Sequence, residues 1–219
     1  SVSDITVYGD ITVKNSASHI GGVVGYINFG SVKNVVSYVN INNDKYGSQV
    51  THAGGIIGSV GNDKTDIEKC MYYGNIHLNN SSDCIGGVIA YSNGGARVKN
   101  CANLGTVTAT QSGAYVGGIL GYLNNTNPTI ENCYNYTKIS DNGSGSHCGA
   151  IIGWARNFNK SNISNNYHNK DTGNTPFGTD SKLGLSANEK TISEFKCGEV
   201  AFKLNNGVTD GTQAWYQNI

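Results

Sequence analysis

The side chains that could bind a metal ion recur at one position of a repeated segment. His19, His52 and Cys84 each stand two residues before a pair of glycines, at steps of 33 and 32 residues. Imidazole nitrogens and thiolates are ligands that Zn²⁺ prefers. A straight column of residues on successive repeats does not converge on one ion, however, and the pattern lacks a fourth ligand. The sequence therefore predicts a packing column here, with no metal site and no cofactor.

Three further cysteines, Cys70, Cys101 and Cys133, repeat with a similar step. If they stack about 4.8 Å apart, their Cα atoms fall within the disulfide range, but parallel in-register side chains hold their Cβ atoms farther apart than the preferred ~3.8 Å. Three thiols in one column also cannot all pair. The sequence favours reduced, internal thiols that act as small hydrophobic groups, and Cys148 falls in a column of core residues.

Tyrosines are the candidate ligand-binding residues. Tyr38, Tyr73 and Tyr136 share one repeat position, and Tyr72 and Tyr134 lie within two residues of it. Rings on an outer sheet face can stack against sugar rings, while nearby Asn, Asp and Ser side chains bond the sugar hydroxyls. The alternative is an internal stack of rings, and the sequence does not decide between the two.

A second aromatic column is predicted to pack inside the fold. Strand alternation groups it with buried aliphatic positions. Its members are Tyr26, Tyr91, Tyr122 and Trp154.

The acidic residues that could cleave a polysaccharide are scattered. Asp63 and Asp66 lie in one loop, whereas Asp83 and Asp141 lie in two others, and the chain has only two arginines. β-Helix lyases and hydrolases need grouped acids, or a basic residue beside calcium-binding carboxylates. The sequence predicts no catalytic site. A polysaccharide-degrading lyase or hydrolase is the alternative function, and a convergent carboxylate cluster would distinguish it.

These residues keep their spacing because the chain repeats itself about every 32 residues. The glycine pairs begin at 21, 54, 86 and 117, and Gly149 with Ala150 continues the series. Each repeat holds three short runs rich in Val, Ile and Tyr, with no ten-residue helical pattern between them. Leucine-rich, ankyrin and tetratricopeptide repeats each need a helix, so the pattern favours an all-β parallel β-helix of about five coils over residues 1–169.

Equivalent residues of successive coils should stack in columns. A glycine column leaves room at a corner and permits backbone angles that other residues resist, while the aliphatic residues after it fill the interior. A column of asparagines predicts a ladder at a tight turn, and a column of alternating charge predicts ion pairs on the surface. The asparagines are Asn34, Asn100, Asn132 and Asn165, and the charges are Lys33, Glu68, Lys99 and Glu131.

Residues 170–219 depart from the repeat. A long connection leads to a capping box of Thr191 and Glu194, which predicts the start of an amphipathic helix. Because a solenoid must cover the open end of its core, this helix and the aromatic tail are predicted to form a C-terminal cap within the same domain.

Charge and hydropathy exclude two classes of partner. Fifteen basic residues balance fifteen acidic ones, so the chain has no net positive charge that would attract nucleic acid or an anionic membrane surface. No run approaches the roughly 18 apolar residues of a membrane span, which predicts no membrane insertion. Ser1 opens directly into a strand-like run without a leader, so we expect a mature or cut fragment of a larger multidomain chain.

The recurring GGIIG or GGVVGY, followed by IENCYN and a glycine-containing strand, resembles the GLUG-type repeats of bacterial cell-surface and secreted proteins. The resemblance covers nearly the whole chain and implies a right-handed β-helix outside the cell. It implies no reaction, because such repeats stand beside many different functional domains. The expected function is a non-catalytic adhesin-like or spacer module that binds a glycan or a host surface protein through a lateral face.

Overall fold

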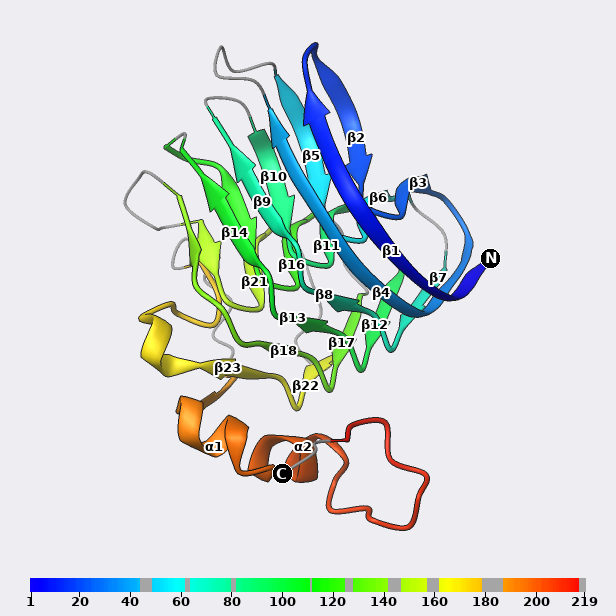
Figure 1. Cartoon of the computed structure of the whole chain (residues 1–219), viewed down its shortest axis with the longest axis vertical. Coiled ribbons are helices and arrows are strands. Elements are labelled where there is room, and N and C mark those ends of the chain that lie inside the picture. Colours follow the sequence, from blue (N-terminus) through cyan, green and yellow to red (C-terminus); the bar gives the residue numbers. More distant parts are fainter. Residues whose placement is uncertain are drawn as a thin grey trace.

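The strands of the molecule wind into a parallel β-solenoid, whose coils follow one another from the N-terminus to two short helices at the other end (Figure 1). The computed structural model describes residues 1–43, 49–61, 64–79, 82–110, 112–124, 128–141, 147–156, 162–178 and 187–216, and of residues 82 and 83 only the backbone. Short strands result because each repeat alternates β-branched runs with turns of Gly, Asn and Asp.

The strands form one 14-stranded sheet, here called the large sheet, and two five-stranded sheets. The large sheet contains β1 (Val2–Val13), β4 (Gly30–Asn43), β7 (Thr65–Glu68), β8 (Met71–Tyr72), β9 (Asn75–Leu78), β12 (Ala96–Lys99), β13 (Ala102–Asn103), β14 (Thr106–Ala109), β17 (Thr129–Glu131), β18 (Tyr134–Asn135), β19 (Ile139–Ser140), β22 (Ile163–Ser164), β23 (Tyr167–Asn169) and β24 (Asn188–Lys190). The second sheet contains β2 (Ala17–Gly21), β5 (Val50–Gly54), β10 (Ser82–Gly86), β15 (Tyr115–Gly117) and β20 (Cys148–Gly149). The third contains β3 (Val24–Ile27), β6 (Ile57–Val60), β11 (Ile89–Ser92), β16 (Leu120–Leu123) and β21 (Ile152–Ala155).

The predicted parallel β-helix is confirmed, and its register is that of the repeat. Gly86 pairs with Gly117, and Tyr91 pairs with Tyr122, across neighbouring coils. Each five-stranded sheet stacks five equivalent strands, which corresponds to about four turns of the solenoid.

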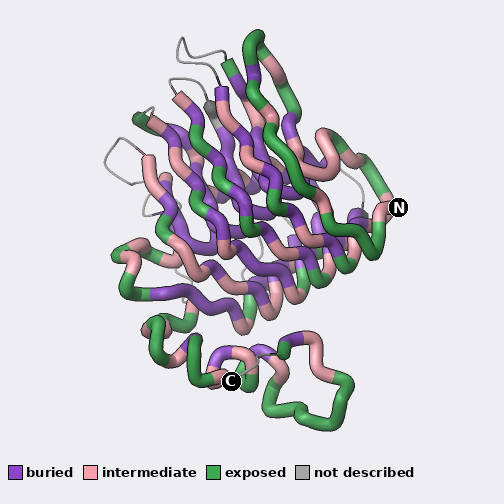
Figure 2. The backbone as a smooth tube through the Cα atoms, in the orientation of Figure 1, coloured by how far each residue is buried: buried purple, intermediate pink, exposed green. Residues whose placement is uncertain are grey.

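Aliphatic columns fill the solenoid, so the buried backbone runs through the stacked coils while exposed backbone concentrates in β1, β2 and the C-terminal segment (Figure 2). Ile57, Ile89, Leu120 and Ile152 form one such column and have no exposed surface. Burying each side chain of this size stabilises the fold by about 1.5–3 kcal/mol. Because every coil repeats the same contacts, the core runs along the solenoid rather than lying at one centre.

The corners of the coils depend on two columns of residues, the first glycine of each pair and the asparagines. A Cβ on the first glycine of each pair would overlap a backbone carbonyl three residues later, so glycine is needed for space, and its φ is not positive. The left-handed φ instead falls on the asparagine column, at 52° for Asn34, 54° for Asn100 and 55° for Asn132. Asparagine tolerates this conformation better than most residues. One step of the expected amide ladder is present, between Asn165 Nδ2 and Asn132 Oδ1 at 2.7 Å. Asn34 instead donates to Asp4 at 2.9 Å, and among the described residues the buried Oδ1 of Asn100 has no partner.

The predicted charge ladder joins exposed side chains of neighbouring coils. Lys33 and Glu68 lie 3.4 Å apart, and Lys99 and Glu131 lie 2.7 Å apart. Exposed pairs of this kind contribute about 0–1 kcal/mol each, so they support the register more than the stability.

All six cysteines are free thiols, as the sequence favoured for the internal ones. The thiols of Cys70 and Cys101 donate to backbone carbonyls inside the solenoid. The hydrogen bond with the neighbouring Cys101 thiol, followed by burial, raises the pKa of Cys70. Burial raises the pKa of Cys101, and it raises that of Cys148 to about 12.

We expect a thiol-reactive dye at pH 8 to label one cysteine, Cys197, within seconds and the other five only on unfolding. Cys197 is exposed, whereas the other five thiols are buried and out of reach of the dye. Cys197→Ser should remove the fast phase. Fast labelling of a second thiol in the native protein would contradict internal stacking.

The C-terminal segment forms two helices where one was expected. The capping box of Thr191 and Glu194 is present and begins α1 (Ile192–Lys196). Gly198, with a φ of 84°, then breaks the helix before α2 (Glu199–Leu204). A short 3₁₀ helix, η2 (Lys170–Thr172), and strand β24 lie in the stretch expected to be a plain connection.

The two helices cover an outer face of the large sheet and not the end of the core. Phe195, Val200, Leu204 and Trp215 form a cluster with outward-facing residues of β13, β18 and β23, separate from the core cluster. Phe177 instead joins the core cluster and bridges to Ile152. The helices predicted to form the cap therefore cover a lateral face of the solenoid. The segment before them, which contains Phe177, covers the end of the core.

Candidate ligand-binding face

An aromatic column runs along the outer face of the large sheet. Tyr8 pairs with Tyr38 in register, and the backbone N–H groups of Tyr73, Leu104 and Tyr136 continue the column from coil to coil. Alternation along the strand sends these residues outward, because their neighbours, such as Tyr72 before Tyr73, face the core. We call Tyr8, Tyr38, Tyr73, Leu104 and Tyr136 the tyrosine strip.

The first three rings of the tyrosine strip stack on one another. The ring centroids of Tyr8 and Tyr38 are 4.9 Å apart and those of Tyr38 and Tyr73 are 5.0 Å apart, with nearly parallel planes. The side chains are 72%, 39% and 37% exposed, respectively. Because the stacked rings cover one another's faces, a ligand would contact the exposed ring edges. Burial and the neighbouring Tyr38 raise the pKa of Tyr73, whose phenol therefore stays a hydrogen-bond donor at neutral pH.

A column of polar side chains accompanies the strip, two residues further along each strand. Asn40 donates to Asp10 Oδ1 at 2.8 Å, and Asn75 donates to Asn40 Oδ1 at 3.1 Å. Thr106 in turn donates to Asn75 Oδ1 at 2.6 Å. Apolar surface with a few oriented amide, hydroxyl and carboxylate groups beside it is typical of small-molecule and sugar sites.

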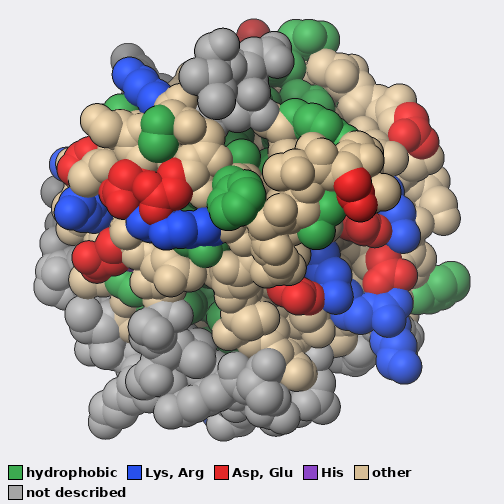
Figure 3. Space-filling model, turned by 90° about the horizontal axis from the view of Figure 1, so that it is seen from below, with side chains coloured by type: hydrophobic (Ala, Val, Ile, Leu, Met, Phe, Trp, Pro, Cys, Tyr) green, Lys and Arg blue, Asp and Glu red, His purple; other side chains and the backbone are tan. Residues whose placement is uncertain are grey.

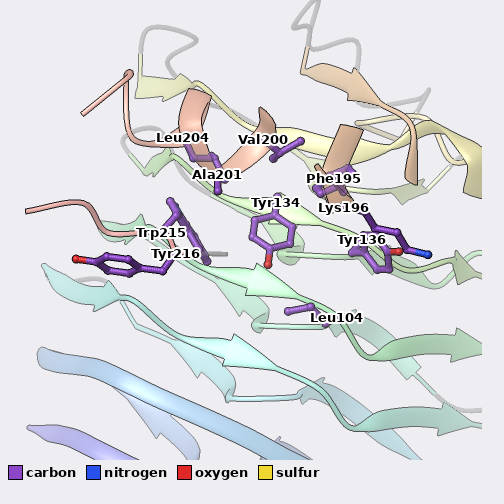
Figure 4. Close-up of a pocket in the computed structure, with 10 residues that line it drawn as sticks. All are labelled: Leu104, Tyr134, Tyr136, Phe195, Lys196, Val200, Ala201, Leu204, Trp215 and Tyr216. Carbon is purple, nitrogen blue, oxygen red and sulfur yellow. The ribbon is translucent and has the colours of Figure 1, made fainter. Parts of the chain in front are cut away.

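The strip ends in a pocket of about 250 Å³ between the sheet and the C-terminal helices, here called the cap pocket (Figure 4). The Tyr134 ring lies 5.0 Å from that of Trp215, and the Tyr136 ring lies 5.4 Å from that of Phe195. Burial raises the pKa of Tyr134, so its hydroxyl also stays protonated. Within the described residues the buried indole Nε1 of Trp215 has no acceptor. The pocket is lined by Leu104, Tyr134, Tyr136, Phe195, Lys196, Val200, Ala201, Leu204, Trp215 and Tyr216.

Four of the five tyrosines singled out in the sequence lie on this connected surface. Tyr38 and Tyr73 are on the open part of the strip, and Tyr134 and Tyr136 line the cap pocket. Tyr72 does not belong to it, because its ring is wholly buried and its hydroxyl donates to the Val39 carbonyl at 2.9 Å. As the residue directly before Tyr73, it faces the interior by strand alternation.

Other residues of this face were not anticipated. Tyr8 could have been found, because YGDI at 8–11 matches YGNI at 73–76 in the repeat. Phe195 and Trp215 carry no such signal, since they lie outside the repeats. Only the folding of the C-terminal segment onto the sheet brings them to Tyr134 and Tyr136.

The second aromatic column faces outward, so the predicted internal packing is wrong. Tyr26 is 55% exposed, and Tyr122 stacks on Trp154 with centroids 5.1 Å apart while both remain half-exposed. In β16, Leu120, Gly121 and Leu123 are buried while Tyr122 is half-exposed, so buried and exposed side chains do not simply alternate. This column lies on the third sheet and is not part of the tyrosine strip.

Described acidic side chains are largely held in exposed ion pairs and hydrogen bonds. Asp66 lies 2.5 Å from Arg97, and Lys190 bridges Glu194 and Glu199. Figure 3 shows acidic and basic side chains next to each other on the side of the molecule where the C-terminal helices lie, with hydrophobic side chains between the charged groups. Asp63 and the side chain of Asp83 lie outside the described residues. Across the described part of the chain, no three His, Cys, Asp or Glu side chains are grouped to hold a metal ion.

No family model, curated protein or solved structure matches this chain. In the described part of the structure, no helix is both long and apolar enough to cross a membrane. The function proposed for the chain therefore depends on the geometry of the tyrosine strip and the cap pocket.

Proposed function

We propose that the chain is a non-catalytic binding module and that the tyrosine strip and the cap pocket bind an extended glycan. The observation that carries this proposal is the pairing of a stacked tyrosine column with a continuous polar column on one open face. Coils repeat about every 4.8 Å along the axis, comparable with the length of one sugar ring. The coils of Tyr8, Tyr38 and Tyr73 thus each offer one ring edge and one polar side chain to a sugar.

The two parts of the site have different roles in this proposal. The strip supplies phenol donors from Tyr38 and Tyr73, with Asn75 beside them as an amide that binds hydroxyls. The cap pocket, walled by Tyr136 and Trp215, accepts the terminal sugar ring against aromatic surface. The Trp215 Nε1 donor would then gain a sugar hydroxyl as acceptor.

The chemistry of the face supports binding over cleavage. The polar column contains one carboxylate, Asp10, which accepts a hydrogen bond from Asn40. A glycoside hydrolase uses two carboxyl groups about 5–9.5 Å apart, one of them as an acid with a raised pKa. A single carboxylate beside amides fits recognition of hydroxyl groups instead.

A secreted or surface-attached bacterial protein is the proposed setting. The resemblance of the repeats to GLUG-type repeats supports it, as do the many Asn, Ser and Thr residues and the low charge. In this setting the module is part of a larger multidomain chain and binds a host or dietary glycan. A host surface protein recognised through its glycans would be the corresponding macromolecular partner.

The test is a glycan and mucin array, with reducing-sugar release measured on the same polysaccharides. We expect binding without release, and about tenfold weaker binding in the Tyr38→Ala, Tyr73→Ala double variant, because each lost ring contact contributes about 0.5–1.5 kcal/mol. Tyr26→Ala, an exposed tyrosine on the third sheet, is the matched control and should bind as the native chain does.

Other outcomes would contradict the proposal. Release of reducing sugars would establish a polysaccharide-degrading enzyme. If neither glycan binding nor release of reducing sugars were detected, the chain would be a structural spacer. Equal loss of binding in the Tyr26→Ala control would place the glycan on a different face.

A further inference from the structure

Two histidines and a serine meet at the edge between the second and third sheets. The Nδ1 atoms of His19, on β2, and His52, on β5, are 3.1 Å apart. The hydroxyl of Ser59, on β6, lies 2.7 Å from the first nitrogen and 2.8 Å from the second. The tight turn after Gly54 returns the chain, so that β6 brings Ser59 beside the histidine column.

The repeat pattern does not reveal this cluster, because Ser59 belongs to a different column of residues from His19 and His52. Ser59 occupies the position that Tyr26 and Tyr91 hold in the neighbouring coils. A serine there leaves room for the two imidazoles to turn toward its hydroxyl. The His19 ring lies 5.4 Å from Tyr26, and the His52 ring is stacked on Tyr91 at 4.5 Å, so neighbouring rings hold both imidazoles in place.

Hydrogen bonds alone do not satisfy this triangle. A proton on both Nδ1 atoms would place two protons between nitrogens 3.1 Å apart, so neutral rings leave at most one there. Adding the Ser59 hydroxyl proton gives at most two protons for three contacts. One contact therefore lacks a proton of its own.

We propose that His19 and His52 chelate one divalent transition-metal ion through their Nδ1 atoms, with Ser59 as an oxygen donor beside them and water in the remaining positions. Two nitrogens about 2.05 Å from one ion are about 2.9 Å apart at a right angle and about 3.3 Å apart at the tetrahedral angle. The separation of 3.1 Å lies between these values. Imidazole ligands suit Zn²⁺, Ni²⁺ and Cu²⁺.

The surroundings keep the pair ready to bind. The exposed His19 leaves a path from solvent to the Nδ1 atoms. This site lies on β2, β5 and β6, whereas the tyrosine strip lies on the large sheet, so the two sites are independent.

The experiment is calorimetric titration of tag-free protein with Zn²⁺ at pH 7.5. Every protein carries Cys197→Ser, because that exposed thiol would itself bind Zn²⁺. We expect one ion per chain in the micromolar range, and a loss of at least tenfold in affinity for His19→Ala and for His52→Gln. Ser59→Ala should weaken binding less than either. His77→Ala removes an exposed histidine on β9 and should leave binding unchanged.

A second measurement needs no variant of the histidines. On addition of Zn²⁺, the ring-proton NMR signals of His19 and His52 should shift together, while those of His77 stay in place. Absence of Zn²⁺ binding in the Cys197→Ser protein would overturn the proposal, as would equally tight binding in both histidine variants.

Discussion

Alanine in place of Gly86 is expected to lower the free energy of unfolding by about 3–5 kcal/mol. The added Cβ would overlap the backbone carbonyl oxygen of Ile89. That carbonyl cannot move freely, because Ile89 N–H donates to Ile119 at 2.9 Å and Gly87 N–H donates to Gly117 at 3.0 Å. Relief of the overlap therefore breaks bonds between coils. Denaturant unfolding followed by circular dichroism measures the loss.

Gly113→Ala is the control for this effect. Gly113 has a φ of 86° but nothing within 4 Å of its Cβ position, so alanine there costs only the backbone strain, about 1–2 kcal/mol. Gly54→Ala and Gly117→Ala should behave like Gly86→Ala, because the same overlap recurs at both positions. If Gly86→Ala were no worse than Gly113→Ala, the close approach at the corner would not explain the glycine column.

Asn103→Asp is expected to cost about 3–5 kcal/mol at pH 7. Asn103 has no exposed surface, and its Nδ2 donates to Asn135 Oδ1 at 2.7 Å. A carboxylate would face that oxygen with a second acceptor. Asn135 cannot turn its amide without loss, because its own Nδ2 donates to the Thr137 carbonyl at 2.7 Å.

The pH dependence of this variant separates burial of charge from loss of a contact. Burial should raise the folded-state pKa of the new carboxyl above its unfolded value of about 3.9. The folded protein then holds the proton more tightly, so stability is greatest below the unfolded pKa and falls as the pH rises toward the folded pKa. At low pH the protonated carboxyl can also donate to Asn135.

Asn75→Asp provides the comparison, because Asn75 is exposed on the outer face. Its change should remain below about 1 kcal/mol. The stability of both variants relative to the native chain is measured from pH 4 to pH 7. A loss in Asn103→Asp that did not change with pH would show that the missing amide donor, and not the buried charge, dominates.

The solenoid keeps its two candidate sites apart. The tyrosine strip uses equivalent residues of successive coils on one sheet, so it can lengthen into a linear surface. The histidine site uses two residues of one column and one residue of a facing column, so it occurs at a single level. A periodic column suits a periodic ligand, whereas a departure from the period, such as Ser59 among tyrosines, makes a local site.

The sequence by itself determined the register of this protein. Parallel strands must align equivalent residues to bond from coil to coil, so the 32-residue step predicts which residues stack, including Cys70 with Cys101 and Tyr38 with Tyr73. It also indicates that Thr191 begins a helix, because a capping box is a local pattern.

Only the tertiary structure decided which columns face outward and which meet across sheets. Whether the Tyr26 side chain faces solvent or the core depends on where the chain bends, and the bend depends on how the second and third sheets pack. The cover over Tyr134 depends on where the C-terminal helices dock, and the position of Ser59 beside His52 depends on the turn between β5 and β6. Repeat spacing carries no information on these contacts, because they join residues that are not equivalent in the repeat.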